Sequence, residues 1–518
     1  MKAVLPMRRV CLALALLFGH AVLPCLLRGA DVELGKLDAY IAQARKDWGV
    51  PGLAVAIVKD GKLVHAGGYG VRELGGEDAV DADTLFAIAS NSKAFTSAAI
   101  ATLVEDGKIG WNDRVKKHLP WFQLYDRYVS EELRVFELLC HRSGLGTYSG
   151  DLLWYGTRYS SEEVVRRARF LDPKGVFRSD FGYSNLMFIA AGEVLKAASG
   201  KPWAKYVEER FFVPLGMKRT RATVRGLEKI ENVATPHGEV MGRLRTFPWA
   251  SWDSMGAAGG VISSVRDMSL WIRMQLGQGQ LAGRQYFSRE SSRKMWKPHM
   301  LTGVSTADRK RFPSTHFKCY ALGWGVQDYL GRKLVRHGGA YDGMYSGVMM
   351  VPEEGLGIVV LTNSMTGISH ALILRILDAY LGGKERDWSS ELLPREKRHR
   401  RRQVEIQEGL LKKRVEGTSP ALKLASYAGT YGGALYGDAT VELEKGRLVL
   451  RFEPAADFVA DLEHLHYDTF LLTWRKTFPW FGKGTCRFLV DKRGKVEEMK
   501  IDVPNEDFWF TELEFKRR

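Results

Sequence analysis

The sequence predicts an α+β protein in which an antiparallel sheet flanked by helices precedes a small C-terminal all-β domain. Near the N-terminus, apolar segments at 52–58 and 63–69 flank the turn Lys59-Asp-Gly-Lys62, a pattern typical of two paired strands. Beyond residue 426, short alternating segments are separated by turn residues, as in a small antiparallel barrel or sandwich. The 518 residues, 45% of them apolar, suffice for one large core and a smaller one.

The individual elements follow from the spacing of apolar residues. Helical spacing predicts helices over 37–48, 94–104 and 186–198, and the second of these ends at Asp106-Gly107. Period-two alternation predicts C-terminal strands at 427–431, 439–443, 447–452, 469–473, 486–490 and 496–501. At 518 residues the chain exceeds one typical domain, which favours two domains over one.

Changes in composition divide the chain into four parts. Residues 1–30 combine basic Arg8-Arg9 with an apolar run, the layout of a secretory signal peptide or of an uncleaved membrane anchor. Residues 31–383 form the helix-and-sheet domain, 384–418 a basic linker, and 419–518 the β-domain. We therefore expect an exported protein, periplasmic or extracellular, with membrane anchoring through the first segment as the alternative.

The linker is the most basic stretch of a chain whose net charge is +16. Its run 394–402 contains five arginines and one lysine. A charge run of this kind is usually a solvated surface, and contact with an anionic wall or membrane surface is favoured over a nucleic-acid-binding arm. Nucleic-acid binding is not expected, because an exported protein seldom meets nucleic acid.

Cysteines and metal-binding patterns are sparse. Only Cys140, Cys319 and Cys486 follow the N-terminal segment, and they show no C-x-x-C pairing, which argues against a disulfide framework and a thiolate zinc site. There is also no H-E-x-x-H or Walker pattern. We expect no metal and no other cofactor.

A serine and a lysine three residues apart are the first candidate catalytic pair. Ser90-x-x-Lys93 follows the apolar residues 86–89 and opens a predicted helix, which places both side chains on one face. A lysine can take the proton of a serine hydroxyl if desolvation lowers its pKa. The same spacing occurs at Ser291 and Lys294, in surroundings typical of a solvated surface helix, so spacing alone does not identify the pair.

Two downstream motifs supply the groups that such a serine requires. In Tyr183-Ser-Asn185, a phenol acidified by a nearby lysine can transfer protons, and the amide can orient the lysine or hold a substrate carbonyl. In the motif His337-Gly338-Gly339, followed by Ala340, the glycines permit close approach of a substrate to the backbone. The amides of Ser90 and Ala340 are the predicted oxyanion hole.

The order of these three motifs resembles that of the serine β-lactamase and penicillin-binding protein superfamily. The similarity is to its class C-like branch of β-lactamases, D-amino-acid peptidases and esterases, and it covers about residues 35 to 380. Further family-like segments lie at 138–145, 214–217, 258–264 and 351–363. The resemblance implies a β-lactamase/transpeptidase-like fold for the first domain.

The resemblance also implies a role for each motif residue. Ser90 is expected to be the acyl-forming nucleophile, with Lys93 and Tyr183 as the proton-transfer groups. The expected substrate-binding residues are Asn185, His337, Gly338 and Gly339, and the oxyanion hole is formed by Ser90 and Ala340. His141, in the segment 138–145, is expected to be structural.

Histidine at position 337 replaces the lysine that is usual in the family. A histidine is mostly neutral near pH 7, so it would bind a substrate carboxylate more weakly than lysine does. The expected function is therefore that of an esterase or of a D-amino-acid peptidase or amidase. A β-lactamase or D-Ala-D-Ala carboxypeptidase acting on peptidoglycan is the alternative.

Two other classes of protein share some of these sequence features. An α/β-hydrolase also uses a serine, but its G-x-S-x-G elbow is absent from the sequence. A non-catalytic cell-wall-binding or sensor protein could retain the fold. Such a protein would not require Ser90, Lys93 and Tyr183 together, which favours the enzyme.

Overall fold

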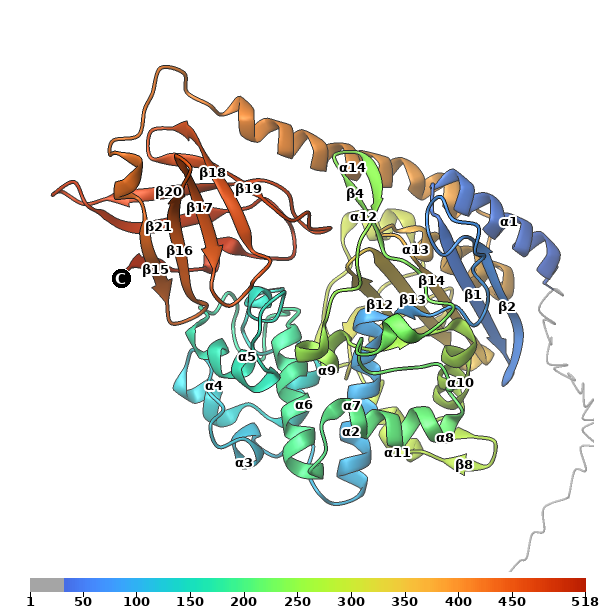
Figure 1. Cartoon of the computed structure of the whole chain (residues 1–518). Coiled ribbons are helices and arrows are strands. Elements are labelled where there is room, and N and C mark those ends of the chain that lie inside the picture. The colour runs from blue at the N-terminus through green and yellow to red at the C-terminus, as the bar shows by residue number, and fades with distance from the viewer. Residues whose placement is uncertain (1–31) are drawn as a thin grey trace, which may run out of the picture.

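The computed structural model describes residues 32–518, so the predicted leader at residues 1–30 lies outside the described part. The chain forms a helix-and-sheet body, a long crossing helix and a C-terminal barrel (Figure 1). This arrangement confirms the predicted α+β fold with a small all-β domain at its C-terminal end.

An eight-stranded antiparallel sheet forms the centre of the body, with strand order β2-β1-β14-β13-β12-β11-β10-β9. Its strands are β1 (Gly52–Lys59), β2 (Lys62–Gly70), β9 (Met300–Leu301), β10 (Lys318–Tyr320), β11 (Gly325–Tyr329), β12 (Arg332–Tyr341), β13 (Met344–Val351) and β14 (Leu356–Thr362). The predicted hairpin is β1–β2. Strand β1 also pairs with β14, with Ile57 opposite Ile358, so strands from the two ends of the body lie side by side, next to the β2 edge of the sheet.

Helices cover both faces of this sheet, which explains why β1 is apolar throughout. Its residues Leu53, Val55 and Ile57 pack in one apolar cluster with α1 (Leu34–Asp47) and α13 (Ile368–Leu381). The alternate residues of the strand face a second cluster, to which α2 (Ser92–Glu105), α6 (Asn185–Ser199) and α10 (Val265–Leu276) contribute. The predicted helices correspond to α1, α2 and α6.

The shorter elements of the body surround these two clusters. The helices are α3 (Val115–His118), α4 (Arg127–Glu132), α5 (Ser161–Arg167), α7 (Trp203–Val207), α8 (Val213–Leu215), α9 (Gly256–Gly259), α11 (Arg289–Met295) and α12 (Thr306–Arg311). The two-stranded pairs are β3 (Phe86–Ala87) with β6 (Ile262–Ser263), β4 (His237–Val240) with β5 (Arg243–Thr246), and β7 (Gln280–Leu281) with β8 (Arg284–Gln285).

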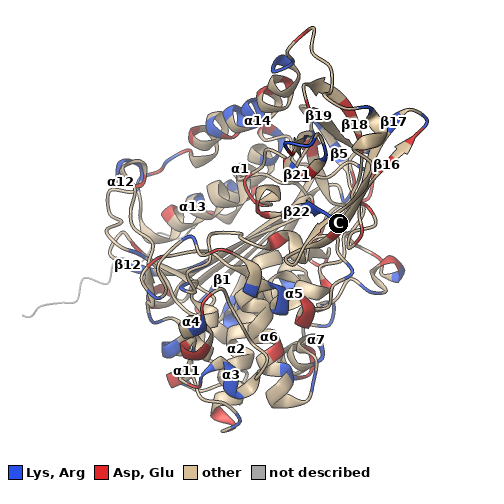
Figure 2. Cartoon of the chain, turned by 90° about the vertical axis from the view of Figure 1, so that its left-hand side faces the viewer, with Lys and Arg blue, Asp and Glu red and all other residues tan. Residues whose placement is uncertain are grey.

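The segment predicted as a basic linker is for the most part a single helix, α14 (Trp388–Lys412), which runs from the body to the barrel (Figure 1). Its first residue, Trp388, is fully buried and donates its indole N–H to the Asp378 carboxylate of α13 at 2.6 Å. Basic side chains follow along its exposed surface (Figure 2). The helix is therefore anchored on the body at its start and presents positive charge further along.

The C-terminal domain is a closed antiparallel barrel. Its strands are β15 (Gly429–Gly433), β16 (Gly437–Glu444), β17 (Arg447–Phe452), β18 (Val459–His466), β19 (Thr469–Trp474), β20 (Gly484–Val490), β21 (Val496–Asp502) and β22 (Phe515–Arg517). Six of them correspond to predicted strands. The sequence analysis missed β18, whose alternation is carried partly by charged residues, and β22, which at three residues is too short to show a period. Strand β22 pairs with both β15 and β21 and closes the barrel.

The barrel packs directly on the body. Its aromatic residue Phe508 lies 4.3 Å from Tyr155 and 5.8 Å from Trp154, between ring centroids. The backbone N–H of Arg158 donates to the Pro454 carbonyl at 2.9 Å. Buried residues of both units belong to one continuous apolar cluster. The segment around residues 150–160 is thus held between the sheet domain and the barrel.

The described residues show no helix long and apolar enough to cross a membrane. Over the same range, no group of three or more His, Cys, Asp or Glu side chains is placed to hold a metal ion. The three cysteines Cys140, Cys319 and Cys486 are free.

Candidate active site

Ser90 lies in a tight turn between strand β3 and helix α2. The turn is a 3-10 helix, η1 (Ala89–Asn91), and Ala89 has a φ of +46°, a conformation that side chains other than glycine rarely adopt. Strand β12 presses against this turn. A Cβ on Gly339 would lie 2.2 Å from the Ile88 carbonyl oxygen and 3.1 Å from the Cβ of Ala89, so only glycine fits at that position. The strained turn is thereby held in place.

Lys93 points from the first turn of α2 toward Ser90 and is fully buried. Its Nζ lies 3.0 Å from Ser90 Oγ, 2.7 Å from Asn185 Oδ1 and 2.9 Å from the Ala258 carbonyl oxygen. A neutral amine has two N–H donors and one lone pair. Because Asn185 Oδ1 and the carbonyl can only accept, they take the two donors, and the lone pair is left for the Ser90 hydroxyl proton.

Burial also adjusts the basicity of this amine. Desolvation lowers the pKa of Lys93 to about 7, although the nearby Asp151 carboxylate opposes this shift. A substantial fraction of the amine is then neutral at physiological pH. The helix position and the environment together give Lys93 the geometry and the pKa of a general base.

Asn185 connects Lys93 to an acid that the sequence analysis missed. It is the first residue of α6, and its Nδ2 donates to Asp151 Oδ2 at 2.7 Å. Asp151 is buried at the start of the 3-10 helix η3 (Asp151–Leu153), and burial raises its pKa to about 7. No sequence motif marks Asp151, because an acid at a short helix start has the appearance of an ordinary cap.

Tyr183 lies beside the Ser90–Lys93 pair, with Lys93 Nζ 4.9 Å from the centre of its ring. The expectation of an acidified phenol is wrong. Burial raises the pKa of Tyr183 well above its usual value, although a hydrogen bond with Ser90 opposes this shift. The side chain is therefore a neutral phenol that can donate its proton.

His141 contacts the segment that carries Tyr183 and Ser184. Its Nδ1 accepts a hydrogen bond from the Ser184 backbone N–H at 3.0 Å, and its ring centre lies 4.1 Å from that of Tyr183. The ring is fully buried, and burial lowers its pKa well below the usual value. These contacts agree with the predicted structural role.

His337 is a neutral hydrogen-bonding residue at the other side of the site. Its Nδ1 lies 2.6 Å from the Gly338 carbonyl oxygen, to which it donates, so Nε2 is left to accept from the Tyr320 hydroxyl at 2.7 Å. Burial lowers the pKa of His337 to about 3, and the positive charge of Lys93 adds to this effect. The third motif therefore carries no cation near pH 7.

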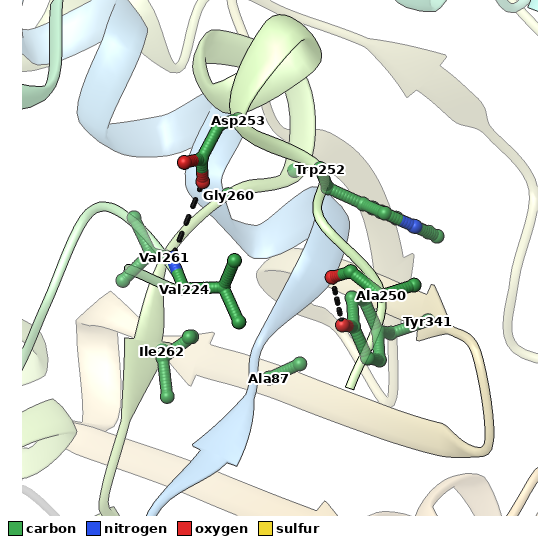
Figure 3. A pocket seen from close by; sticks show the side chains of 10 residues that line it. Ala87, Val224, Ala250, Trp252, Asp253, Gly260, Val261, Ile262 and Tyr341 are labelled. Atoms are coloured by element: carbon green, nitrogen blue, oxygen red, sulfur yellow. Dashed lines mark hydrogen bonds between the residues drawn. The ribbon is translucent and has the colours of Figure 1, made fainter. Parts of the chain in front are cut away.

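Strand β12 brings the third motif to the Ser90 turn. Gly338, Gly339 and Ala340 pair with β13, and the contact of Gly339 with residues 88–89 sets Ala340 close to Ser90. A small cavity of about 10 Å³ is lined by Tyr341 of this strand, by Ala87 and Val224, and by residues of the segment 250–262 (Figure 3). The same segment carries Ala258, whose carbonyl oxygen holds Lys93.

The second Ser-x-x-Lys pair has a different environment. Ser291 lies on the surface helix α11 but is buried, and its hydroxyl donates to Glu105 Oε1 at 2.5 Å. The helix lies at the surface, as expected, but the Ser291 side chain faces inward and its hydroxyl joins α11 to α2. None of the groups that surround Ser90 is found beside it among the described residues.

The barrel reaches this site through Glu512, which lies in the 3-10 helix η10 (Phe510–Glu512) between β21 and β22. Its Oε1 accepts from Ser149 Oγ at 2.6 Å, and its Oε2 accepts from the Gly150 backbone N–H at 2.9 Å. These are the two residues before Asp151. Glu512 thus holds the backbone next to Asp151, and hydrogen bonds lead from the Asp151 carboxylate through Asn185 to Lys93.

Comparison with known proteins agrees with the geometry of the site. Residues 37–382 match the family model Beta-lactamase, and residues 413–517 match a domain of unknown function, DUF3471. The first match covers most of the chain. The protein therefore belongs to the Beta-lactamase family and is a serine hydrolase of the β-lactamase-related type.

Curated relatives resemble the chain at moderate identity. The unguisins hydrolase ungD' of Aspergillus campestris is 27% identical over 436 residues, which cover 79% of this chain and 78% of that protein. Protein flp of Staphylococcus aureus is 26% identical over 350 residues, covering 63% and 62%.

Two solved structures share the fold. The octameric penicillin-binding protein homologue from Pyrococcus abyssi superposes with a TM-score of 0.61 at 23% identity, covering 94% of this chain and 100% of that one. A D-stereospecific amidohydrolase from Streptomyces sp. gives a TM-score of 0.54 at 22% identity, covering 67% and 98%. The first of them matches across both the sheet domain and the barrel.

The Glu512 contact predicts that the barrel supports catalysis. In Glu512→Ala both hydrogen bonds to residues 149–150 are lost, so Asp151 and, through Asn185, Lys93 should be held less firmly. We expect kcat for a p-nitrophenyl ester to fall by roughly 3- to 10-fold with little change in KM, as for the loss of about 1 kcal/mol of positioning.

Glu514→Gln is the matched control, because Glu514 is an exposed acid two residues away. Its kinetics should equal those of the wild type. An unchanged kcat in Glu512→Ala, with the same unfolding midpoint as the wild type, would contradict a positioning role.

Proposed function

We propose that this serine hydrolase is exported and cleaves amides or esters through an acyl-enzyme on Ser90. The observation that carries the proposal is the environment of Lys93. Its two acceptor-only partners, Asn185 Oδ1 and the Ala258 carbonyl, leave one Nζ lone pair for the hydroxyl 3.0 Å away. A buried amine arranged in this way favours general-base catalysis over a purely structural role.

In the first step Ser90 Oγ attacks the substrate carbonyl carbon while its proton passes to neutral Lys93. The carbonyl oxygen becomes an oxyanion, which the backbone amides of Ser90 and Ala340 would stabilise. When the tetrahedral intermediate collapses, the bond to the leaving amine or alcohol breaks. The phenol of Tyr183 can donate the proton that the leaving group takes, and Lys93 can return a proton to Tyr183.

In the second step a water molecule attacks the acyl-enzyme. The water gives one proton to the same Lys93–Tyr183 pair, and the bond to Ser90 Oγ breaks, which releases a carboxylic acid and restores the serine hydroxyl. Asn185 orients Lys93 through both steps. It also has the family position of a substrate-binding residue, as do His337, Gly338 and Gly339.

Amide substrates are favoured by the relatives, and the charge of the site disfavours substrates that carry a carboxylate. A D-stereospecific amidohydrolase and an unguisins hydrolase are among the similar proteins. Because burial lowers the pKa of His337 to about 3, the site has no permanent cation in the third motif for the carboxylate of a penicillin or of a terminal D-alanine. An esterase, peptidase or amidase is thus favoured over a β-lactamase or a carboxypeptidase acting on peptidoglycan.

Covalent labelling tests the proposal directly. A serine-reactive fluorophosphonate should label the wild type, and a fluorescent penicillin should label it more slowly, because the site offers no cation for the penicillin carboxylate. Both labels should be lost in Ser90→Ala, whereas Ser291→Ala, the matched control, should keep them. Absence of labelling together with absence of ester hydrolysis would overturn the proposal in favour of a non-catalytic binding or sensor protein.

The acid–base behaviour of Lys93 gives a second prediction. The lysine acts as a base only when it is neutral, and its pKa is lowered to about 7. The kcat/KM of a neutral ester should therefore rise about tenfold per pH unit below pH 7 and level off above it. A pH profile of acylation measures this, and an inflection near the usual lysine value of about 10.4 would contradict the proposed base.

We further propose contact between the basic helix α14 and an anionic surface outside the cytoplasm. Arg398, Arg401 and Arg402 are exposed on this helix. Co-sedimentation with anionic vesicles should be strong at low salt, weak at high salt and reduced when the three arginines are replaced by glutamine. Equal binding to neutral vesicles would contradict it. Cell fractionation tests export.

A further inference from the structure

The β12–β13 hairpin, which carries Ala340 of the predicted oxyanion hole, turns at Asp342 and Gly343. Gly343 has a φ of +83°, and a Cβ there would lie 2.6 Å from the His237 backbone nitrogen, so the turn requires glycine. The same His237 N–H donates to the Gly343 carbonyl at 2.9 Å. The end of the hairpin is therefore packed closely on the body, two residues away from Ala340.

The other turn residue, Asp342, is a buried acid that joins the hairpin to the barrel. Its side chain is 5% exposed. The Tyr155 hydroxyl donates to Oδ2 at 3.2 Å, and the indole N–H of Trp480, in the barrel connection between β19 and β20, donates to Oδ1. Three separate parts of the chain, namely the hairpin, the 150–160 segment and the barrel, thus meet at one carboxylate.

Two hydrogen bonds and one cation support the charge of this acid. Burial raises the pKa of Asp342 to about 7, and the hydrogen bonds from Trp480 and Tyr155 oppose the shift, as does the positive charge of Lys476. Lys476 itself is exposed and forms an ion pair with Asp457. The loss of either donor would leave part of a buried carboxylate without a partner, which is costly. The ionised acid therefore holds both donors in place.

Aromatic packing fixes the groups on both sides of this contact. The ring centre of Phe508 lies 4.3 Å from that of Tyr155 and 5.9 Å from that of Trp480. On the hairpin side, the Tyr341 hydroxyl donates to the Ala250 carbonyl (Figure 3). Because packed rings resist displacement, a hydrogen bond between them transmits position from the barrel to the hairpin.

We propose that Asp342 is a positioning residue for the oxyanion hole, which ties the hairpin that carries Ala340 to Trp480 of the barrel. This inference rests on the proposed function, in which the Ala340 amide stabilises the oxyanion. A misplacement of about 1 Å in such a site can lower a rate roughly 100-fold, so a fixed hairpin end matters for catalysis. The barrel then acts on two sides of Ser90, through Glu512 on the base and through Asp342 on the oxyanion hole.

The test compares a p-nitrophenyl ester with the thionoester of the same acid at about pH 8.5, where Asp342 is ionised. In the thionoester a sulfur replaces the carbonyl oxygen, and sulfur is a weak hydrogen-bond acceptor, so its hydrolysis depends less on the oxyanion hole. Asp342→Asn keeps the size of the side chain and removes its charge. Trp480→Phe removes the indole N–H and keeps an aromatic ring.

In each variant we expect kcat for the ester to fall roughly 10-fold at unchanged KM, and kcat for the thionoester to fall by less than about 2-fold. The double variant should be no slower than the slower single variant, because both changes break the same hydrogen bond. Asp502→Asn is the matched control, since Asp502 is an exposed aspartate of β21, and it should equal the wild type.

An unchanged kcat for the ester in either variant, an equal fall for both substrates, or additive losses in the double variant would overturn the role of Asp342. Unfolding midpoints show whether each variant is folded, and Trp480→Phe alone decides if Asp342→Asn does not fold. A wild type that hydrolyses neither substrate and takes no fluorophosphonate label would overturn the proposed function and this inference with it.

Discussion

The burial of one amine, that of Lys93, is the constraint on which the site depends. A lysine out of contact with water loses its charge readily, and the surrounding oxygens determine where its lone pair points. Asn185 comes from the start of α6 and the Ala258 carbonyl from α9, so two distant segments must pack on α2 before the amine is oriented. The two-faced sheet and its helices hold those segments together.

The barrel belongs to this arrangement and is more than an appended domain. Glu512 binds the two residues before Asp151, and Asp151 is hydrogen-bonded to the asparagine that orients the lysine. The position of the base therefore involves a domain that starts more than 300 residues after the serine. The barrel packs on the body through one continuous apolar cluster, which holds these contacts in place.

The site also shows how burial changes the roles that residue types suggest. A phenol near a lysine was expected to be acidic, yet Tyr183 is desolvated more strongly than its neighbours compensate, and it remains a proton donor. His337 was expected to be mostly neutral, and burial makes it more so. The direction of each shift depends on how far water is excluded, which only the packed structure defines.

The sequence by itself determined the fold class, the motifs and the hairpin β1–β2, because local period and turn chemistry are properties of neighbouring residues. It placed Ser90, Lys93, Tyr183, Asn185 and His337 as candidates, and the structure brings them together. Only the tertiary structure revealed Asp151 and Glu512, since their roles arise from contacts between segments far apart in the chain and no local pattern marks them. Only the tertiary structure shows that the barrel is closed, because the three-residue strand β22 is recognised by its pairing with β15 and β21 and not by a sequence pattern.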